Sequence, residues 1–540
     1  MSLVEVTGLR VDFGELRAVD GLSFRLEQGA ALALVGESGS GKSTVASALL
    51  GLHHGTGARV GGSVRVAGTD VQRASDEELR RLRGGQAAMV FQDPLSSLDP
   101  YYAIGDQIAE VYRVHARVSR RAARARAVDV LDRVGIADAA RRSRSRPHEF
   151  SGGMRQRALI AMALACEPRL LIADEPTTAL DVTVQAQVLD LLRTLREETG
   201  MGLLLVTHDV GVAAESVDEV LVMRHGRAVE HGPVSSVLGA PAQPYTRELL
   251  AAVPRLDAPR AGSTAPEKAV LEEAAPQGAV LEATGLRREF GRGKRAFTAV
   301  RDVSLTLRRG ETLGVVGESG SGKTTLGRML VGLLEPTAGE VRYEGRPHTG
   351  VNPAVQMVFQ DPVSSLNPRR SVGESIADPL RARGERDEGR IRERAAELLE
   401  RVGLEGAHYD RYPHEFSGGQ RQRVGIARAL AADPLVIVCD EPVSALDVTT
   451  QAHVVALLGE LQRELGLALV FVAHDLAVVR QVSDRVAVMR QGRIVEEGPV
   501  DEVYGSPQDP YTRQLLAAVP ALDPEAAARR RAERRELAAA

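Results

Sequence analysis

The chain has 540 residues, of which 44% are hydrophobic, so it is long enough to form two or more domains with substantial cores. Its formal net charge of −4 is not the positive balance typical of nucleic-acid-binding proteins. The sequence has no run of about 18 apolar residues that could span a bilayer, and its N-terminus is unlike a signal peptide, so we expect a cytoplasmic protein.

The sequence contains a long internal repeat. Four segments of the first half recur in the second: residues 36–44 as 317–325, 90–100 as 358–368, 148–157 as 414–423, and 244–254 as 510–520. Duplication of this extent predicts two domains of the same fold. We place the domain boundaries as follows: a first domain at 1–255, a Pro- and Ala-containing linker at 256–280, a second domain at 281–523 and a charged tail at 524–540. The tail could form a helix, but because it has no apolar face we expect a frayed charged extension and not an interaction module.

Each half begins its central region with an apolar strand that runs into a glycine-rich loop and then a helix. Later apolar strands end in Asp-Glu-Pro, at LLIADEP and VIVCDEP, and in His-Asp, at LLLVTHD and LVFVAHD. Buried strands that alternate with helices predict a parallel sheet whose ligand site lies at the carboxyl ends of the strands. The segments near 106–146 and 373–412 read as helices inserted before the SGG motifs.

The glycine-rich loops match the pattern G-x-x-x-x-G-K-[ST], which binds nucleotide phosphates. Glycines let backbone amides converge on the phosphates, the lysine reaches the outer phosphates, and the next hydroxyl can ligate Mg²⁺. The candidate residues of the first loop are Gly36, Ser38, Gly39, Ser40, Gly41, Lys42, Ser43 and Thr44. Those of the second loop are Gly317, Ser319, Gly320, Ser321, Gly322, Lys323, Thr324 and Thr325. Ser43 and Thr324 are the candidate metal ligands among them.

Two carboxylates follow each other at the end of one strand in each half. Asp174 and Asp440 end apolar strands, where a carboxylate can hold the metal of a bound nucleotide. Glu175 and Glu441 come next, and a carboxylate in that place can orient water and accept its proton. The alternative is that each glutamate only caps its strand.

With SGGMR and SGGQR, both halves resemble the ATP-binding-cassette family over nearly their whole length. The resemblance implies an α/β fold of two tandem P-loop NTPase domains, each with a RecA-like parallel-sheet core, an antiparallel β subdomain and an inserted α-helical subdomain. It implies ATP and Mg²⁺ as cofactors. In that family the signature faces the γ-phosphate held by the opposite domain, which implies intramolecular pairing of the halves. That role would fall to Ser151, Gly152, Gly153, Ser417, Gly418, Gly419 and Gln420. A plain helix cap is the alternative reading.

Further motifs of the family have matches in both halves. Gln92 and Gln360 match its glutamine loop, which contacts metal and water. His208 and His474 match its switch histidine, and Asp181 and Asp447 match the loop that links the two sites. Phe13 stands where the family has an adenine-stacking aromatic residue, and Phe290 is the second candidate, although a core phenylalanine is the alternative for either.

Three repeated segments, VFQDP-x-SSL-[DN]-P, HEFSGG and PYTR-x-LLAAVP, resemble those of the peptide-permease branch of bacterial importers. The first half, with SGGMRQRALIAMAL, resembles its D-type subunit, and the second half, with SGGQRQRVGIARAL, resembles its F-type subunit. D-type subunits with a cysteine cluster near the C-terminus differ from this chain, whose only cysteines are Cys166 and Cys439. The resemblance implies an ATPase at the inner face of the cell membrane that docks on two integral-membrane permease subunits. An extracytoplasmic solute-binding protein would deliver peptides or related solutes.

Other functions remain open from the sequence. A soluble tandem cassette protein that acts on ribosomes or DNA is one alternative, although the short linker and the lack of zinc-binding cysteines oppose it. An exporter motor is another, opposed by the repeated PYTR segments. Eleven arginines between Arg113 and Arg146 could contact nucleic acid or anionic lipid, but interspersed acids favour a solvated helical face, and we expect no nucleic-acid partner.

Overall fold

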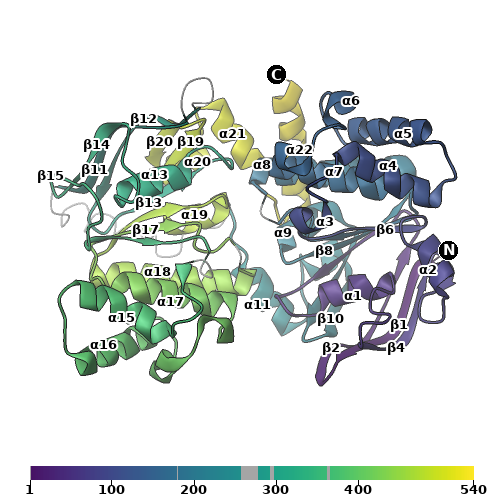
Figure 1. Cartoon of the computed structure of the whole chain (residues 1–540), viewed down its shortest axis with the longest axis horizontal. Coiled ribbons are helices and arrows are strands. Elements are labelled where there is room, and N and C mark those ends of the chain that lie inside the picture. The colour runs from purple at the N-terminus through teal and green to yellow at the C-terminus, as the bar shows by residue number, and fades with distance from the viewer. Residues whose placement is uncertain are drawn as a thin grey trace. The chain divides into compact units, whose positions relative to one another are not determined.

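The computed structural model describes residues 2–178, 180–256, 278–291, 297–361, 365–444 and 446–539. Contacts divide the chain into two units, one made of Met1–Val253 with Pro520–Ala540 and one made of Pro254–Val519 (Figure 1). Most of the expected linker, residues 257–277, lies outside the described residues. Each unit has two sheets with helices around them, so the predicted α/β class is confirmed.

The first unit has an antiparallel four-stranded sheet and a mainly parallel six-stranded sheet. The four-stranded sheet has the order β2-β1-β4-β5, with β1 at Ser2–Phe13, β2 at Leu16–Glu27, β4 at Arg59–Val66 and β5 at Thr69–Asp70. The six-stranded sheet has the order β10-β9-β3-β8-β7-β6, and only β10 is antiparallel to its neighbour. Its strands are β3 at Ala31–Val35, β6 at Ala87–Val90, β7 at Leu170–Asp174, β8 at Gly202–Thr207, β9 at Glu219–Arg224 and β10 at Arg227–Pro233.

The second unit repeats this plan. Its antiparallel sheet has the order β12-β11-β14-β15, with β11 at Ala279–Phe290, β12 at Phe297–Arg308, β14 at Ala338–Tyr343 and β15 at Arg346–Pro347. Its six-stranded sheet has the order β16-β17-β18-β13-β19-β20. Those strands are β13 at Thr312–Val316, β16 at Val355–Val358, β17 at Val436–Asp440, β18 at Ala468–Val472, β19 at Arg485–Arg490 and β20 at Arg493–Pro499.

Central strand β3 explains how the first unit builds two cores from one sheet. Successive side chains of a strand point to opposite faces. Ala33 and Val35 therefore join the core that includes the helical subdomain, while Leu32 and Leu34 join the core shared with the antiparallel sheet. All five residues of β3 are buried because both faces are covered, which accounts for the unbroken apolar run.

The helices of the first unit are α1 (Lys42–Leu49), α2 (Asp76–Leu82), α3 (Pro94–Ser97), α4 (Ile104–His115), α5 (Arg120–Arg133), α6 (Ala139–Arg142), α7 (Gly152–Leu164), α8 (Val182–Thr199), α9 (Val210–Ser216), α10 (Val234–Val237) and α11 (Pro244–Ala252). Those of the second are α13 (Lys323–Leu330), α15 (Val372–Ala382), α16 (Glu388–Arg401), α17 (Gly418–Leu430), α18 (Val448–Leu465), α19 (Leu476–Val482), α20 (Val500–Gly505) and α21 (Pro510–Ala517). Helices α4 to α6 in one unit, and α15 and α16 in the other, form the predicted insertion before the SGG helix.

The expectation that the tail frays was wrong. Residues Pro524–Ala539 form helix α22, which belongs to the first unit and contacts α9. The absence of an apolar face misled the sequence argument, because much of the contact is ionic. Arg534 lies 3.6 Å from both Asp190 and Glu215.

Helix α7, which carries the first SGG motif, packs closely on α8. A Cβ atom added at Gly153 would lie 2.4 Å from Cγ1 of Val184, whereas one added at Gly152 would meet only Leu180, at an ordinary 3.7 Å. Glycine is therefore required at position 153 by the close approach of the two helices.

We predict that Gly153→Ala destabilises the first half by about 1–3 kcal/mol through overpacking. Gly152→Ala is the matched control and should leave thermal unfolding nearly unchanged. Val184→Ala in the Gly153→Ala background should recover stability because it removes the clashing methyl group. Thermal unfolding without nucleotide measures all three, and equal effects of the two glycine substitutions would contradict the packing argument.

Candidate nucleotide-binding and hydrolysis sites

The glycine that precedes each P-loop helix is fixed by geometry. Gly41 has a φ of 96°, and a Cβ atom there would lie 2.4 Å from the carbonyl oxygen of Ala18. Gly322 has a φ of 105° and the same 2.4 Å approach to the oxygen of Ala299. Both the left-handed backbone and the neighbouring carbonyl exclude a side chain. The loop can therefore turn directly into the helix that follows.

The two P-loop lysines are buried and held by the loops themselves. Nζ of Lys42 donates to the carbonyl oxygens of Gly36 and Glu37, each at 2.8 Å. In the second half, Nζ of Lys323 donates to those of Gly317 at 2.7 Å and Glu318 at 2.9 Å. Each lysine side chain therefore lies across the loop that the pattern assigns to phosphates.

The hydroxyl after each lysine meets the first carboxylate of the Asp-Glu pair. Oγ of Ser43 donates to Asp174 at 3.0 Å, and Oγ1 of Thr324 donates to Asp440 at 3.0 Å. Burial raises the pKa of Asp174 to about 6, and the hydrogen bond from Ser43 offsets only part of this effect. The pKa of Asp440 is also raised, with burial as the main cause. A nearby cation would favour the ionised form of both carboxylates.

In the first half, the predicted catalytic residues converge on Glu175. Nε2 of Gln92 donates to its carboxylate at 2.7 Å, Nδ1 of His208 lies 3.1 Å away, and Oγ1 of Thr178 donates at 3.0 Å. Burial alone would raise the pKa of Glu175, but His208, Thr178 and Lys42 together outweigh burial and the pKa is lowered. Burial alone would lower the pKa of His208, but Glu175 together with Asp209 outweighs burial and the pKa is raised.

The second half has the same cluster around Glu441. Nε2 of Gln360 donates to Glu441 at 2.8 Å, and Nδ1 of His474 lies 3.2 Å from the carboxylate. The pKa of Glu441 is lowered and that of His474 is raised. In each case burial acts in the opposite direction, and the attraction between the two side chains favours their charged forms. Gln360 and His474, which lie far apart in the sequence, thus meet at one carboxylate.

Both glutamates have a left-handed backbone. The φ of Glu175 is 47° and that of Glu441 is 45°, which is uncommon for residues with a side chain. Their amide groups donate to Val206 at 2.8 Å and Val472 at 2.9 Å, on the neighbouring strand. Such strain persists where surrounding contacts enforce it and is typical of functional positions.

The signature motifs are exposed helix caps. Ser151 accepts the amide of Met154 at 3.3 Å, and Ser417 accepts the amide of Gln420 at 3.3 Å. Gln420 also completes a capping box by accepting the amide of Ser417 at 2.9 Å, which Met154 cannot do. Asp181 and Asp447 likewise cap α8 and α18. The capping alternative is thus present in the geometry, alongside free helix N-termini suited to anions.

The two candidate stacking residues differ in their surroundings. Phe13 is 39% exposed and meets His53 edge-on, with ring centroids 5.4 Å apart. Phe290 is covered by Phe297, stacked at 5.5 Å, and by the guanidinium of Arg288 at 4.9 Å. Phe13 therefore keeps an exposed ring surface, while the ring of Phe290 is engaged by two side chains.

Tyr511, which the sequence motifs do not single out, reaches the second P-loop. The hydroxyl of Tyr511 accepts the amide of Glu318 at 2.9 Å, its side chain is buried, and Arg490 lies over its ring at 4.7 Å. Tyr245, the equivalent residue of the first half, has Arg224 over its ring at 4.5 Å. Both tyrosines lie in the repeated PYTR segments, which are the signal of this contact in the sequence.

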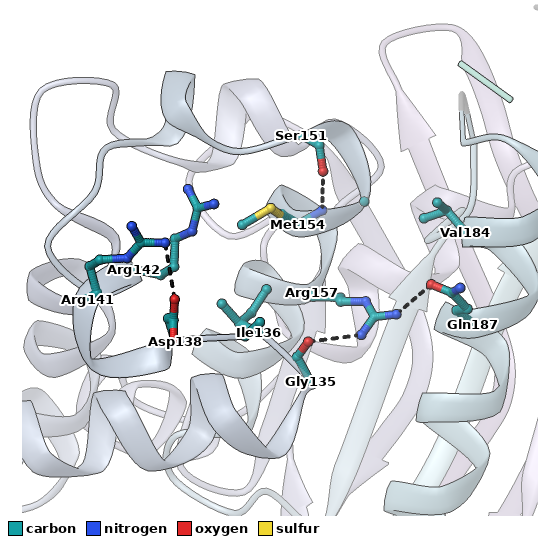
Figure 2. Close-up of a pocket in the computed structure, with 12 residues that line it drawn as sticks. Gly135, Ile136, Asp138, Arg141, Arg142, Ser151, Met154, Arg157, Val184 and Gln187 are labelled. Atoms are coloured by element: carbon teal, nitrogen blue, oxygen red, sulfur yellow. Dashed lines mark hydrogen bonds and ion pairs between the residues drawn. The ribbon is translucent and has the colours of Figure 1, made fainter. Parts of the chain in front are cut away.

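A pocket of about 320 Å³ lies beside the first signature helix (Figure 2). Arg157 lines the pocket and donates to Gln187 at 2.8 Å. Arg141 pairs with Asp138 at 3.2 Å. Elsewhere in the arginine-rich region Arg124, Arg126 and Arg133 pair with Asp or Glu, which supports a solvated face with internal ion pairs.

Comparisons with known proteins show the family of the chain. The family model described as ABC transporter matches residues 19–178 and 300–444. The chain belongs to the ATP-binding-cassette transporter family. A second model, the C-terminal region of oligopeptide/dipeptide transporters, matches residues 229–281 and 495–539, so the chain is a peptide-permease-branch member with two ATP-binding cassettes.

Similar proteins include the glutathione import ATP-binding protein GsiA of Salmonella choleraesuis (strain SC-B67), 47% identical over 97% of this chain and 90% of the relative. GsiA of Escherichia coli (strain K12) is 47% identical over 95% of this chain and 88% of the relative. A solved structure of the ATP-binding cassette MJ0796 bound to ADP and Pi is 31% identical and covers 41% of this chain and 98% of that one, with a TM-score of 0.38.

These findings establish the cassette chain as an ATP-hydrolysing importer subunit, and the ribosomal, DNA-repair and exporter alternatives are not favoured. Its domains bind ATP, as expected from the sequence. Within the described residues, every helix is too short or too polar to cross a membrane.

We predict that Tyr511→Phe weakens ATP binding at the second site about two- to tenfold, because the Glu318 amide loses its acceptor and the loop is less well positioned. Tyr504→Phe is the control, since it removes a partly buried hydrogen bond to the carbonyl oxygen of Leu476, at 3.0 Å, elsewhere in the same unit. ATP titration in a Lys42→Ala background isolates the second site. Equal losses in both variants would indicate a general stability effect and no role in positioning the loop.

Proposed function

We propose that both halves of this importer ATPase bind ATP with Mg²⁺ and hydrolyse it. The observation that carries this proposal is the pair of matching clusters: Gln92 and His208 around Glu175, and Gln360 and His474 around Glu441. Two complete copies support turnover at both sites, even though Met154 stands where the other half has Gln420. We assign residues 1–255 and 281–523 to the two cassette halves.

In the proposed reaction, Glu175 and Glu441 act as general bases. Their lowered pKa leaves each carboxylate ionised and able to accept a proton near neutral pH. The water oxygen forms a bond to the γ-phosphorus as the bond to the bridging oxygen breaks, and ADP and phosphate leave. His208 and His474 hold the carboxylates in position, and Gln92 and Gln360 help to orient the water.

Mg²⁺, when bound, would neutralise charge on the β- and γ-phosphates. Ser43 and Asp174 would hold it in the first half, and Thr324 and Asp440 in the second, with Gln92 and Gln360 beside it. Paired hydroxyl and carboxylate oxygens 3.0 Å apart suit a cation that prefers oxygen ligands. A divalent cation would also offset the burial that raises the pKa of Asp174.

The remaining site residues are assigned to the rest of the nucleotide. Phe13 would stack on adenine, and the two P-loops would hold the phosphates. The exposed signature caps at Ser151 and Ser417 would close over the γ-phosphate of the nucleotide bound by the other half, and Asp181 and Asp447 would link the sites. Charge, amides and hydroxyls at these positions suit an anionic ligand.

We infer that the chain works at the inner face of the cell membrane with two permease subunits and an extracytoplasmic solute-binding protein. The cargo class we propose is peptides or glutathione-like solutes. Support comes from the oligopeptide/dipeptide C-terminal match and from relatives whose names give glutathione import.

We predict that Glu175→Gln combined with Glu441→Gln lowers steady-state ATP hydrolysis by about 10²–10⁴-fold, since an amide cannot accept the proton of water. ATP binding should be retained because the phosphate-binding loops are intact. Phosphate release and equilibrium ATP binding measure the two effects, and each single variant tests one site. Near-normal turnover in the double variant would contradict the assigned role. No measurable turnover at the unaltered site of either single variant would contradict hydrolysis at both sites.

We predict that each ATP is held by the lysine of one half and the signature of the other. The test uses the double variant Glu175→Gln, Glu441→Gln, which binds ATP without hydrolysing it. In it, Lys42→Ala and Ser417→Arg should disable the same site, so their combination should occlude as much ATP as either alone. Lys42→Ala with Ser151→Arg should abolish occlusion, because it disables both sites. Radiolabelled ATP occlusion measures the result, and the reverse pattern of coupling would exclude cross-pairing.

A further inference from the structure

The C-terminal arm, residues Pro520–Ala540, belongs to the first unit although it follows the second along the chain. It continues into α22, the yellow helix of Figure 1, which contacts α9. The chain thus enters the second unit at Pro254 and returns to the first at Pro520. These two residues are equivalent in the repeat, since both end an LLAAVP segment.

The arm is anchored on a buried carboxylate. Glu215, in α9, accepts the amide of Ala521 at 3.2 Å, and its side chain is only 4% exposed. Arg534 of α22 lies 3.6 Å from Glu215 and 3.6 Å from Asp190 of α8, and its own side chain is 13% exposed. Arg531 donates to the carbonyl oxygen of Glu215 at 3.4 Å. The pair of Arg534 with Glu215 has so little exposure that it is screened far less than a surface pair.

Apolar contacts accompany the charges. Leu522 packs against the core of the first unit, and Ala527 of α22 is 1% exposed. Pro520 approaches α9 so closely that a Cβ atom at Gly211 would lie 3.1 Å from its Cβ. The arm therefore fits α9 because Gly211 has no side chain where Pro520 comes closest.

The receiving surface differs from its counterpart in the repeat. Ala477 and Gln481 occupy the positions in the second half that are equivalent to Gly211 and Glu215. An unpaired buried carboxylate is costly, and burial does raise the pKa of Glu215, with Arg534 opposing that shift. The basic partner Arg534 accounts for the acidic Glu215 in the first half, where the second half has the neutral Gln481.

We propose that the α8–α9 face of the first half is a docking surface for the chain's own C-terminal arm, and that the docked arm is a second link between the halves besides the linker. It does not depend on nucleotide chemistry, so it stands apart from the proposed function. The docking surface is acidic and the arm is basic. This charge pattern would let the surface bind the segment that follows the second half and not the segment that follows the first.

The test uses the full-length chain with a specific protease site placed within residues 257–277. After cleavage, without nucleotide, the wild-type fragments should co-elute in size-exclusion chromatography at the mass of the intact chain. Arg534→Glu, which changes only the arm, should weaken their association at least about tenfold. Glu215→Arg should do the same, and combining both reversals should restore much of the affinity.

Gln481→Arg is the matched control and should leave co-elution unchanged. Gly211→Ala provides a second, uncharged variant that crowds Pro520 and should also loosen the arm. Unchanged association in Arg534→Glu, or lack of recovery in the double reversal while ATP binding shows both halves folded, would overturn the proposal. Co-elution at twice the mass would show that a second copy supplies the arm, and would overturn it as an internal link.

Discussion

Parallel pairing of β8 with both β3 and β7 is the constraint on which the first site depends. In this register Val35 lies opposite Thr207, and Asp174 lies opposite Val206. The three strands therefore end at one edge of the sheet, and the residues that follow them begin there: the P-loop after β3, Glu175 after β7 and His208 after β8. Pairing of β18 with β13 and β17 has the same effect in the second half. Main-chain hydrogen bonds thus bring side chains together that are more than a hundred residues apart.

Opposing electrostatic effects then give the two carboxylates of each half different properties. Asp174 is buried beside a neutral hydroxyl, and its pKa is raised. Glu175, one residue later, is comparably enclosed but has a histidine partner, and its pKa is lowered. The left-handed backbone at Glu175 turns successive carboxylates toward different partners. Asp174 stays close to the hydroxyl of Ser43 in the P-loop helix, and Glu175 meets His208 and Gln92.

The halves are near copies at the centre of each site and diverge around it. Lysine, hydroxyl, aspartate, glutamate, glutamine and histidine all recur with closely matched distances. Differences lie further out, where Phe13 has an open ring and Phe290 a covered one, and where Glu215 corresponds to Gln481. Catalytic geometry tolerates little variation, whereas surfaces around it can acquire separate partners.

The sequence alone determined the repeat, the sheet class, the inserted helices and the candidate residues that the structure brings together around Glu175 and Glu441. It could do so because P-loop, Asp-Glu and signature motifs are local patterns in which spacing and residue type follow from phosphate chemistry. Tertiary structure decided which side chains touch. Tyr511 reaches a loop nearly two hundred residues earlier, and the charged tail forms a docked helix. Neither result is visible in periodicity, because a single tyrosine hydroxyl or a buried ion pair such as Arg534 with Glu215 leaves no repeating apolar pattern. Their partners are set by long-range packing.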